Sequence, residues 1–171
     1  LSDARAAIAD RERSRGAYAV SAESVFIGNG VSELIDLSLR ALLDPGDEVL
    51  VPAPDYPLWS AAVRLNDGVP VYYDCPASTG FLPDPEQLQH RIGPRTRALV
   101  LINPNNPTGA VYTAALLTQL VELARRHGLL LLSDEIYDGI TYDGARFTPL
   151  ASLAGDTPCL TYGGLSKVFR V

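Results

Sequence analysis

The sequence has few of the residues that mark disulfide-rich or metal-binding proteins. Its 171 residues include one lysine, two cysteines, two histidines and no methionine. The cysteines, Cys75 and Cys159, are too few for a disulfide scaffold and lack the paired spacing of a zinc site. His90 and His127 lie within helical patterns. No metal site is therefore expected.

Charge and hydropathy argue against two further classes of protein. The formal net charge of −6 disfavours nucleic-acid and anionic-membrane binding, because both need a basic surface. No apolar run approaches the roughly 20 residues that cross a bilayer. The chain opens on Leu1-Ser2-Asp3 without a basic-then-apolar leader, and it does not begin with methionine. We expect a cytoplasmic protein with small-molecule partners and with no nucleic-acid or membrane partner.

The remaining composition is that of an ordinary globular domain, with 47% hydrophobic and 20% charged residues. Helical patterns alternate with short apolar runs at residues 25–27, 49–51, 69–73, 98–102, 129–132 and 159–162. Continuous apolar strands separated by helices are typical of a sheet that is covered on both faces. The sequence therefore predicts an α/β fold, a mostly parallel sheet with helices on both faces, in one domain or part of one.

Ligands of such sheets bind beyond the carboxyl ends of the strands, so polar residues after each apolar run are candidate site residues. Gly30, Val31 and Ser32 follow the first run and open a helix, where backbone N–H groups can bind an anion such as phosphate. A glycine turn with a capping serine gives the same pattern, so this motif also has a purely structural explanation.

Two charged residues stand in unusual places. Asp134 ends the apolar run 129–133, where a carboxylate is costly unless it has a cationic partner. Lys167, the only lysine, follows the last apolar run and a Gly-Gly-Leu-Ser turn, where an amine can serve as a nucleophile. The structural alternatives are a helix cap or surface acid for Asp134 and a solvated surface position for Lys167.

Two loops complete the candidate set. Tyr56, just before Pro57, can stack its ring on a planar ligand or simply pack in the core, as Trp59 is expected to do. Residues 103–109 read Asn-Pro-Asn-Asn-Pro-Thr-Gly, a motif whose asparagines can donate hydrogen bonds but whose composition is also that of a plain turn.

Taken in order, these motifs resemble those of the fold-type I (class I/II) pyridoxal phosphate-dependent aminotransferases. Three motifs are similar in sequence to the alanine (glutamate–pyruvate) and tyrosine aminotransferase branch of this family. They are residues 103–109, Ser-Asp-Glu-Ile-Tyr at 133–137, and residues 162–167. The resemblance implies that residues 1–171 are a partial cofactor-binding large domain, without the family's N-terminal arm and small C-terminal domain. It also implies a homodimer when full length, with pyridoxal 5'-phosphate as cofactor.

The resemblance assigns a role to each candidate. Lys167 forms the Schiff base with the cofactor, and Asp134 pairs with its protonated pyridine nitrogen. Asn106 and Tyr137 donate hydrogen bonds to the phenolate oxygen, and Tyr56 stacks on the ring.

Phosphate binding falls to the helix start at Gly30, Val31 and Ser32. The family often has a phosphate-binding hydroxyl three places before the lysine, where this sequence has Gly164, and Ser166 is a substitute.

The implied reaction is transamination between an amino acid, alanine by this resemblance, and a 2-oxo acid, 2-oxoglutarate. Alternatives on the same scaffold are an aromatic amino-acid aminotransferase and a carbon–sulfur lyase or cyclising synthase. An effector-binding domain of a transcription regulator and a non-catalytic remnant also remain open. Complete members carry two further arginines, for the phosphate and for the substrate carboxylate, and a further strand between the first and last strands found here.

Overall fold

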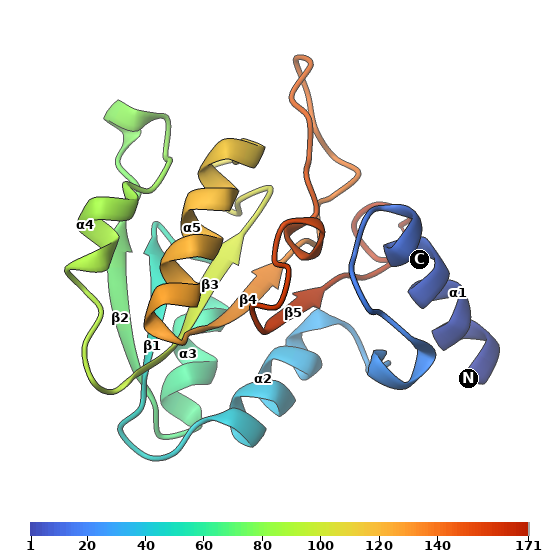
Figure 1. Cartoon of the computed structure of the whole chain (residues 1–171), viewed down its shortest axis with the longest axis horizontal. Helices are drawn as coiled ribbons and strands as arrows, with labels where there is room; N and C mark the ends of the chain where they lie inside the picture. Colours follow the sequence, from blue (N-terminus) through green and yellow to red (C-terminus); the bar gives the residue numbers. More distant parts are fainter. Residues whose placement is uncertain (171) are drawn as a thin grey trace.

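The computed structural model describes residues 1–170, which form a parallel five-stranded sheet between helices (Figure 1). The strands are β1 (Glu48–Ala53), β2 (Val69–Asp74), β3 (Thr96–Ile102), β4 (Leu130–Asp134) and β5 (Cys159–Tyr162). Their order in the sheet is β2-β1-β3-β4-β5, and every neighbouring pair is parallel. The predicted α/β fold with a mostly parallel sheet is confirmed.

The helices are α1 (Ser2–Ser14), α2 (Val31–Leu42), α3 (Pro57–Leu65), α4 (Pro85–Gln89) and α5 (Ala114–His127), with short 3₁₀ helices at η1 (Ala22–Ser24), η2 (Ala77–Thr79) and η3 (Leu150–Ser152). Residues with cap preferences stand at the start of α4 and the end of α5. The Asp84 carboxylate caps α4 by accepting a hydrogen bond from the backbone N–H of Glu86. At the end of α5, Gly128 adopts the left-handed conformation, with φ of 65°, that favours glycine.

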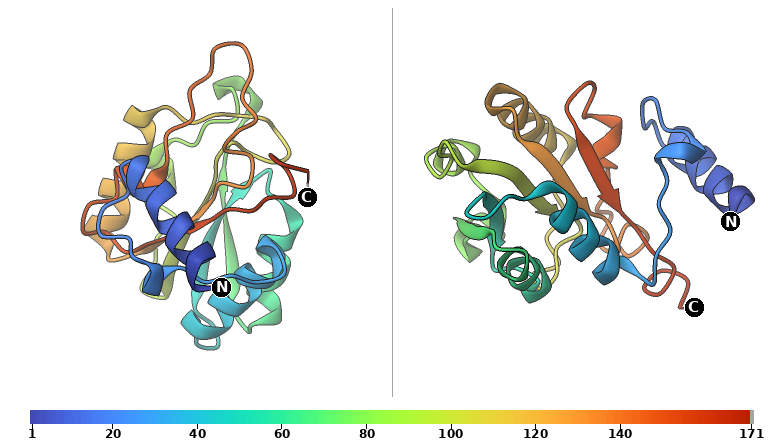
Figure 2. Two further views of the ribbon diagram at one scale, coloured as in Figure 1. Left: turned by 90° about the vertical axis from the view of Figure 1, so that its right-hand side faces the viewer. Right: turned by 90° about the horizontal axis from the view of Figure 1, so that it is seen from below.

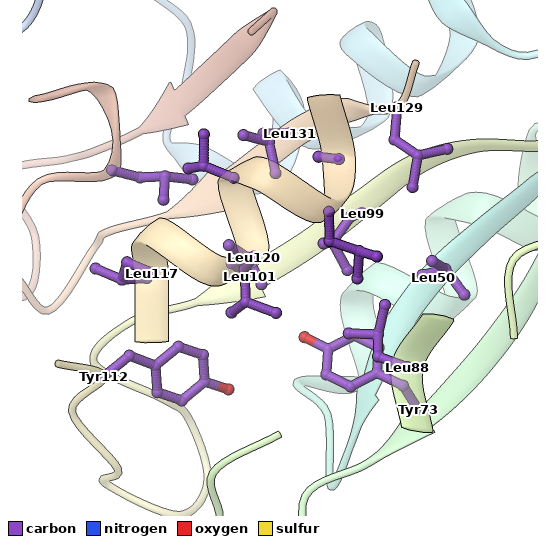
Figure 3. Packing of buried hydrophobic residues seen from close by; sticks show 14 of the residues in the cluster. Leu50, Tyr73, Leu88, Leu99, Leu101, Tyr112, Leu117, Leu120, Leu129 and Leu131 are labelled. Carbon is purple, nitrogen blue, oxygen red and sulfur yellow. The ribbon is translucent and has the colours of Figure 1, made fainter. Parts of the chain in front are cut away.

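Alternate strand residues face the two sides of the sheet and build two apolar clusters. On one side Leu50, Leu99 and Leu131 pack with the apolar face of α5 and with α4 (Figure 3). On the other side Val49 and Val100 pack beneath α2 and α3. Because both faces are covered, the strands are apolar along their length rather than alternating with polar residues.

The predicted strand at Val25–Ile27 is wrong, because the segment has no strand hydrogen bonds. Its side chains are not held in the core, since Phe26 is 77% exposed and Ile27 45% exposed. Strand β5 is an edge of the sheet, and α1 lies beyond that edge (Figure 2). An apolar run becomes a strand only where a neighbour satisfies its backbone groups, and within residues 1–170 this run has no such neighbour.

Helix α1 is tied to the turn after β4 by ion pairs. Arg11 and Arg15 contact the Asp138 carboxylate at 2.6 and 2.9 Å. The Arg15 guanidinium also lies over the Phe147 ring, 5.2 Å from its centroid. The N-terminal helix is therefore anchored to the segment that follows Asp134.

A membrane-spanning helix must be both long and apolar, and none of the helices in residues 1–170 meets these conditions.

Glu135 is a buried carboxyl that connects β4 to η3. Its Oε1 accepts hydrogen bonds from the Ser133 hydroxyl and from the Leu150 backbone N–H, both at 2.9 Å. Burial raises the pKa of Glu135 from its usual 4.5 to about 7, against the opposing effect of these two bonds. The Glu135 carboxyl is thus a structural group of the fold, and its raised pKa makes the stability of the protein depend on pH.

We expect replacement of Glu135 by glutamine to remove part of the pH dependence of stability. Below pH 4.5 the carboxyl is neutral in folded and unfolded chains, but between 4.5 and about 7 it ionises mainly in the unfolded chain. The free energy of unfolding therefore falls as pH rises through this window, by up to about 3 kcal/mol. Urea midpoints of the cofactor-free full-length protein at pH 5 and pH 8 measure the effect.

Glutamine keeps the acceptor oxygen and cannot ionise, so the variant should gain stability over the wild type at pH 8. Glu86→Gln, a change at an exposed glutamate in α4, is the control and should leave the profile unaltered. Parallel pH profiles for wild type and Glu135→Gln would contradict the prediction.

Candidate active site

The carboxyl edge of the sheet collects the chemically distinctive residues. Tyr56 follows β1, Asn106 follows β3, Asp134 is the last residue of β4, and Lys167 follows β5. Because the strands are parallel, all four sequence positions lie at the same edge, where ligands of such sheets bind. The topology therefore brings the predicted set to one side of the domain.

Asp134 is held at the end of β4 in an apolar environment and is only 2% exposed. Its Oδ2 accepts a hydrogen bond from the indole N–H of Trp59 at 3.0 Å, and its Oδ1 accepts a long one, 3.4 Å, from the backbone N–H of Ile136. Burial raises the pKa of Asp134, and the Trp59 hydrogen bond opposes this shift most strongly. No lysine, arginine or histidine within residues 1–170 forms an ion pair with this carboxylate.

The loop that carries Ser166 and Lys167 packs against the turn after β4. A Cβ atom at Gly164 would lie 2.7 Å from the Ile136 side chain, and one at Gly139 would lie 2.7 Å from the Val168 side chain. Both glycines thus allow a close approach of the two segments. The side chains of Ser166 and Lys167 are exposed.

The same contacts reach the start of α2. The Cβ position at Gly164 is also 3.6 Å from the Val31 side chain. Helix α2 begins after Gly30, whose φ of 84° favours glycine, and no side chain caps it. The first backbone N–H groups of this helix, at Val31 and Ser32, have no intrahelical acceptors, as in every helix. An anion at this point would meet both free N–H groups and the positive end of the helix dipole.

Asn106 and Tyr137 are brought together at a surface cavity of about 440 Å³, which is also lined by Ile140 and Tyr142. Neighbouring asparagines hold the loop that carries Asn106. The Asn103 Oδ1 accepts a hydrogen bond from the Tyr112 backbone N–H at 2.9 Å, and the Asn105 Oδ1 accepts from the Thr108 N–H and hydroxyl at 3.1 and 2.8 Å. The side chains of Asn103 and Asn105 thus hold the loop, and both Asn105 and Asn106 line the cavity.

Tyr56 does not line this cavity. It is half-buried at the N-terminal end of α3 and packs against the cluster on the α2 and α3 side of the sheet. Trp59, in the same helix, is fully buried, as predicted. Its hydrogen bond to Asp134 was not predicted from the sequence. The proline that starts α3 puts Trp59 in the first helical turn, but nothing in the local sequence indicates that the indole meets the end of β4.

These residues suit pyridoxal phosphate on chemical grounds. Asp134 is a buried carboxylate that has no cationic partner among the described residues. The protonated pyridine nitrogen of the cofactor would be such a partner. The uncapped start of α2 suits a phosphate, and the amine of Lys167 follows the neighbouring strand. No group of His, Cys, Asp and Glu side chains that could hold a metal ion occurs among residues 1–170.

A parallel sheet with this set at its carboxyl edge has the architecture of the fold-type I pyridoxal phosphate-dependent transferases. The family profile described as "Aminotransferase class I and II" matches residues 1–171. The chain belongs to the class I and II aminotransferases.

The proteins that are similar to this chain in sequence and in structure are also aminotransferases. The alanine aminotransferase of Mycobacterium tuberculosis is 55% identical over all 171 residues, and the glutamate-pyruvate aminotransferase AlaA of Escherichia coli is 53% identical. The crystal structure of an Escherichia coli aminotransferase superposes on the whole of the present chain with a TM-score of 0.98 at 53% identity. The matched region is 42% of the Escherichia coli chain. A mutant aspartate aminotransferase of Thermus thermophilus superposes on 99% of the chain and 44% of its own, with a TM-score of 0.94 at 38% identity. The chain spans 40% and 42% of the lengths of the first two relatives.

Proposed function

We propose that the protein containing this chain is a pyridoxal phosphate-dependent aminotransferase that moves an amino group between a small amino acid and a 2-oxo acid. The observation that carries the proposal is the buried Asp134 carboxylate, which lacks a cation within residues 1–170 and lies at the same sheet edge as the only lysine. A buried carboxylate is costly unless a charged ligand compensates it. Membership of the aminotransferase family supports the same conclusion.

In this proposal the chain holds the cofactor ring by five side chains. Lys167 binds it covalently through Nζ, and Asp134 pairs with the ring nitrogen through a charge-assisted hydrogen bond. Asn106 and Tyr137, which line one cavity, donate hydrogen bonds to the phenolic oxygen. Tyr56 contributes its aromatic face to the ring.

The phosphate group is assigned to the start of α2. The backbone N–H groups of Val31 and Ser32 donate to it, and Gly30 leaves the approach free, because a Cβ atom there would meet nothing within 4 Å. Ser166 contributes a hydroxyl from the loop that packs near Val31 through Gly164.

The chemistry follows from these positions. When bound, pyridoxal phosphate supplies an electron sink for the negative charge that develops on the substrate Cα. Lys167 would hold the cofactor through Nζ, and with that amine free Nζ would act as the base that takes the proton from the substrate Cα. The Asp134 carboxylate would pair with the ring nitrogen, and Tyr137 and Asn106 would orient the ring.

We further propose alanine and 2-oxoglutarate as the substrates, and a cytoplasmic homodimer as the full-length enzyme. The names of the two relatives at 55% and 53% identity support alanine, glutamate and pyruvate as the compounds exchanged. The sequences of residues 28–35 and 51–59, which resemble those of alanine aminotransferases, support the same assignment.

A panel of amino donors tests this substrate assignment. We expect the full-length enzyme, with 2-oxoglutarate as acceptor, to have a kcat/KM for alanine at least tenfold above that for tyrosine or phenylalanine. The tenfold margin is a lower bound, because a single methylene is already worth about 1–3 kcal/mol in an apolar pocket and the aromatic donors exceed alanine by a whole ring. A tenfold preference for the aromatic donors would reject alanine and favour the aromatic aminotransferases, whereas elimination of the donor side chain without transfer would indicate a lyase.

A further inference from the structure

Trp59 is the one side chain that forms a short hydrogen bond to Asp134 among the residues described. Its indole N–H donates to Oδ2 at 3.0 Å, and both side chains are buried, with Trp59 0% and Asp134 2% exposed. We infer that Trp59 is a positioning residue for Asp134: it fixes one carboxylate oxygen, which leaves the other oxygen for the cofactor nitrogen. The inference rests on the proposed function for the identity of that ligand.

The two oxygens of Asp134 have different surroundings. Oδ2 is engaged by the indole, whereas Oδ1 has only the 3.4 Å contact with the Ile136 backbone N–H. A hydrogen bond at this length is weak, so Oδ1 retains the capacity to accept a stronger one. The indole thus sets which oxygen is free.

The same bond favours the ionised form of the carboxyl. Burial raises the pKa of Asp134, and the Trp59 hydrogen bond is the largest influence that lowers it again. Only the ionised carboxylate forms a charge pair with a protonated ring nitrogen. Loss of the indole donor therefore weakens the partner that the cofactor needs, without removing Asp134 itself.

The indole is itself held in place from two other elements. The Tyr162 ring meets it edge to face, with 5.3 Å between ring centroids and 83° between ring planes. The Tyr162 hydroxyl lies 2.6 Å from the Ser38 hydroxyl in α2, and Tyr162 is paired in register with Asp134 across β4 and β5. A chain of contacts from Ser38 through Tyr162 and Trp59 thus ends on Asp134 and links it to α2.

A cofactor analogue without the ring nitrogen gives a direct test. Dissociation constants of pyridoxal 5'-phosphate and of its 1-deaza analogue are measured for the cofactor-free full-length protein and for Trp59→Phe. Phenylalanine keeps a buried aromatic ring and removes the donor. If Trp59 acts through Asp134 on the ring nitrogen, Trp59→Phe weakens pyridoxal phosphate binding at least tenfold and changes binding of the 1-deaza analogue less than twofold.

The control is Tyr73→Phe, which also removes one buried aromatic donor. The Tyr73 hydroxyl donates to the Val100 carbonyl at 2.7 Å and belongs to the cluster on the opposite side of the sheet. It should change neither dissociation constant more than twofold. β-(3-Benzothienyl)alanine incorporated at position 59 is a second variant, since it has nearly the shape of tryptophan without the N–H donor, and it should reproduce the selective loss even if Trp59→Phe does not fold.

The outcomes separate the inference from the proposed function. Equal weakening of both probes would assign Trp59 a purely structural role, and unchanged affinity for both would remove its role altogether. Either result overturns the inference while the wild-type protein still binds pyridoxal phosphate. A wild-type protein that binds neither probe would overturn the proposed function and the inference together.

Discussion

Replacement of Lys167 by alanine is expected to abolish covalent attachment of pyridoxal phosphate and to lower kcat/KM on the order of 10⁴-fold or more, because one amine supplies both nucleophile and base. No other lysine occurs in these 171 residues, so the chain offers no substitute amine. Borohydride reduction of the loaded full-length protein, followed by peptide mapping, identifies the attachment site. A pyridoxyl label on any residue other than Lys167 would reject the assignment.

Lys167→Arg separates the charge of this residue from its reactivity. Arginine keeps the positive charge, but its guanidinium stays protonated and cannot serve as the nucleophile. We expect this variant to be as inactive as Lys167→Ala and to take up no label. Substantial turnover by Lys167→Arg would mean that the side chain acts only through its charge.

Asp134→Asn is the second change with a large expected effect. Asparagine preserves the size of the side chain and an acceptor for the Trp59 indole, but it removes the charge that pairs with the ring nitrogen. Breaking one side of a buried ion pair costs about 3–5 kcal/mol, which corresponds to a loss of roughly 10² to 5 × 10³-fold in cofactor affinity or turnover. Single-turnover rates and the cofactor dissociation constant measure the two effects.

The stability of the cofactor-free protein distinguishes a functional from a structural carboxylate. Burial raises the pKa of Asp134, so the ionised group destabilises the fold when no cation compensates it. Asp134→Asn should therefore unfold at an equal or higher denaturant concentration than the wild type while it binds the cofactor poorly. A lower unfolding midpoint, together with normal transamination, would make Asp134 a structural residue.

The strand-end residues could be predicted from sequence because the signal is local. Asp134 is a charge at the end of a leucine run, and parallel strands bring their carboxyl ends together whatever their order in the sheet. The partnership between Trp59 and Asp134 could not be predicted in this way. It joins α3 to β4 across 75 residues of sequence, and no periodicity records which buried ring meets which strand end.

The strand predicted at Val25–Ile27 is wrong because a local signal alone does not decide whether a strand forms. The composition of this segment is that of a strand, but strand formation depends on a neighbour that the local sequence does not specify.

The glycine at position 164, which departs from the family pattern, has a packing reason that only the structure reveals. A side chain there would displace Ile136, on the turn between Asp134 and Tyr137.

The anchoring of α1 has a consequence for synthesis of the chain on the ribosome. Arg11 and its partner Asp138 are 127 residues apart, so at 5–20 residues per second α1 leaves the ribosome roughly 6–25 s before its docking site exists. A 13-residue helix with a single buried residue, Ala9, is marginal in water by itself. Residues 2–14 therefore remain largely without helical structure during translation, and they take up their helical position only after most of the sheet has emerged.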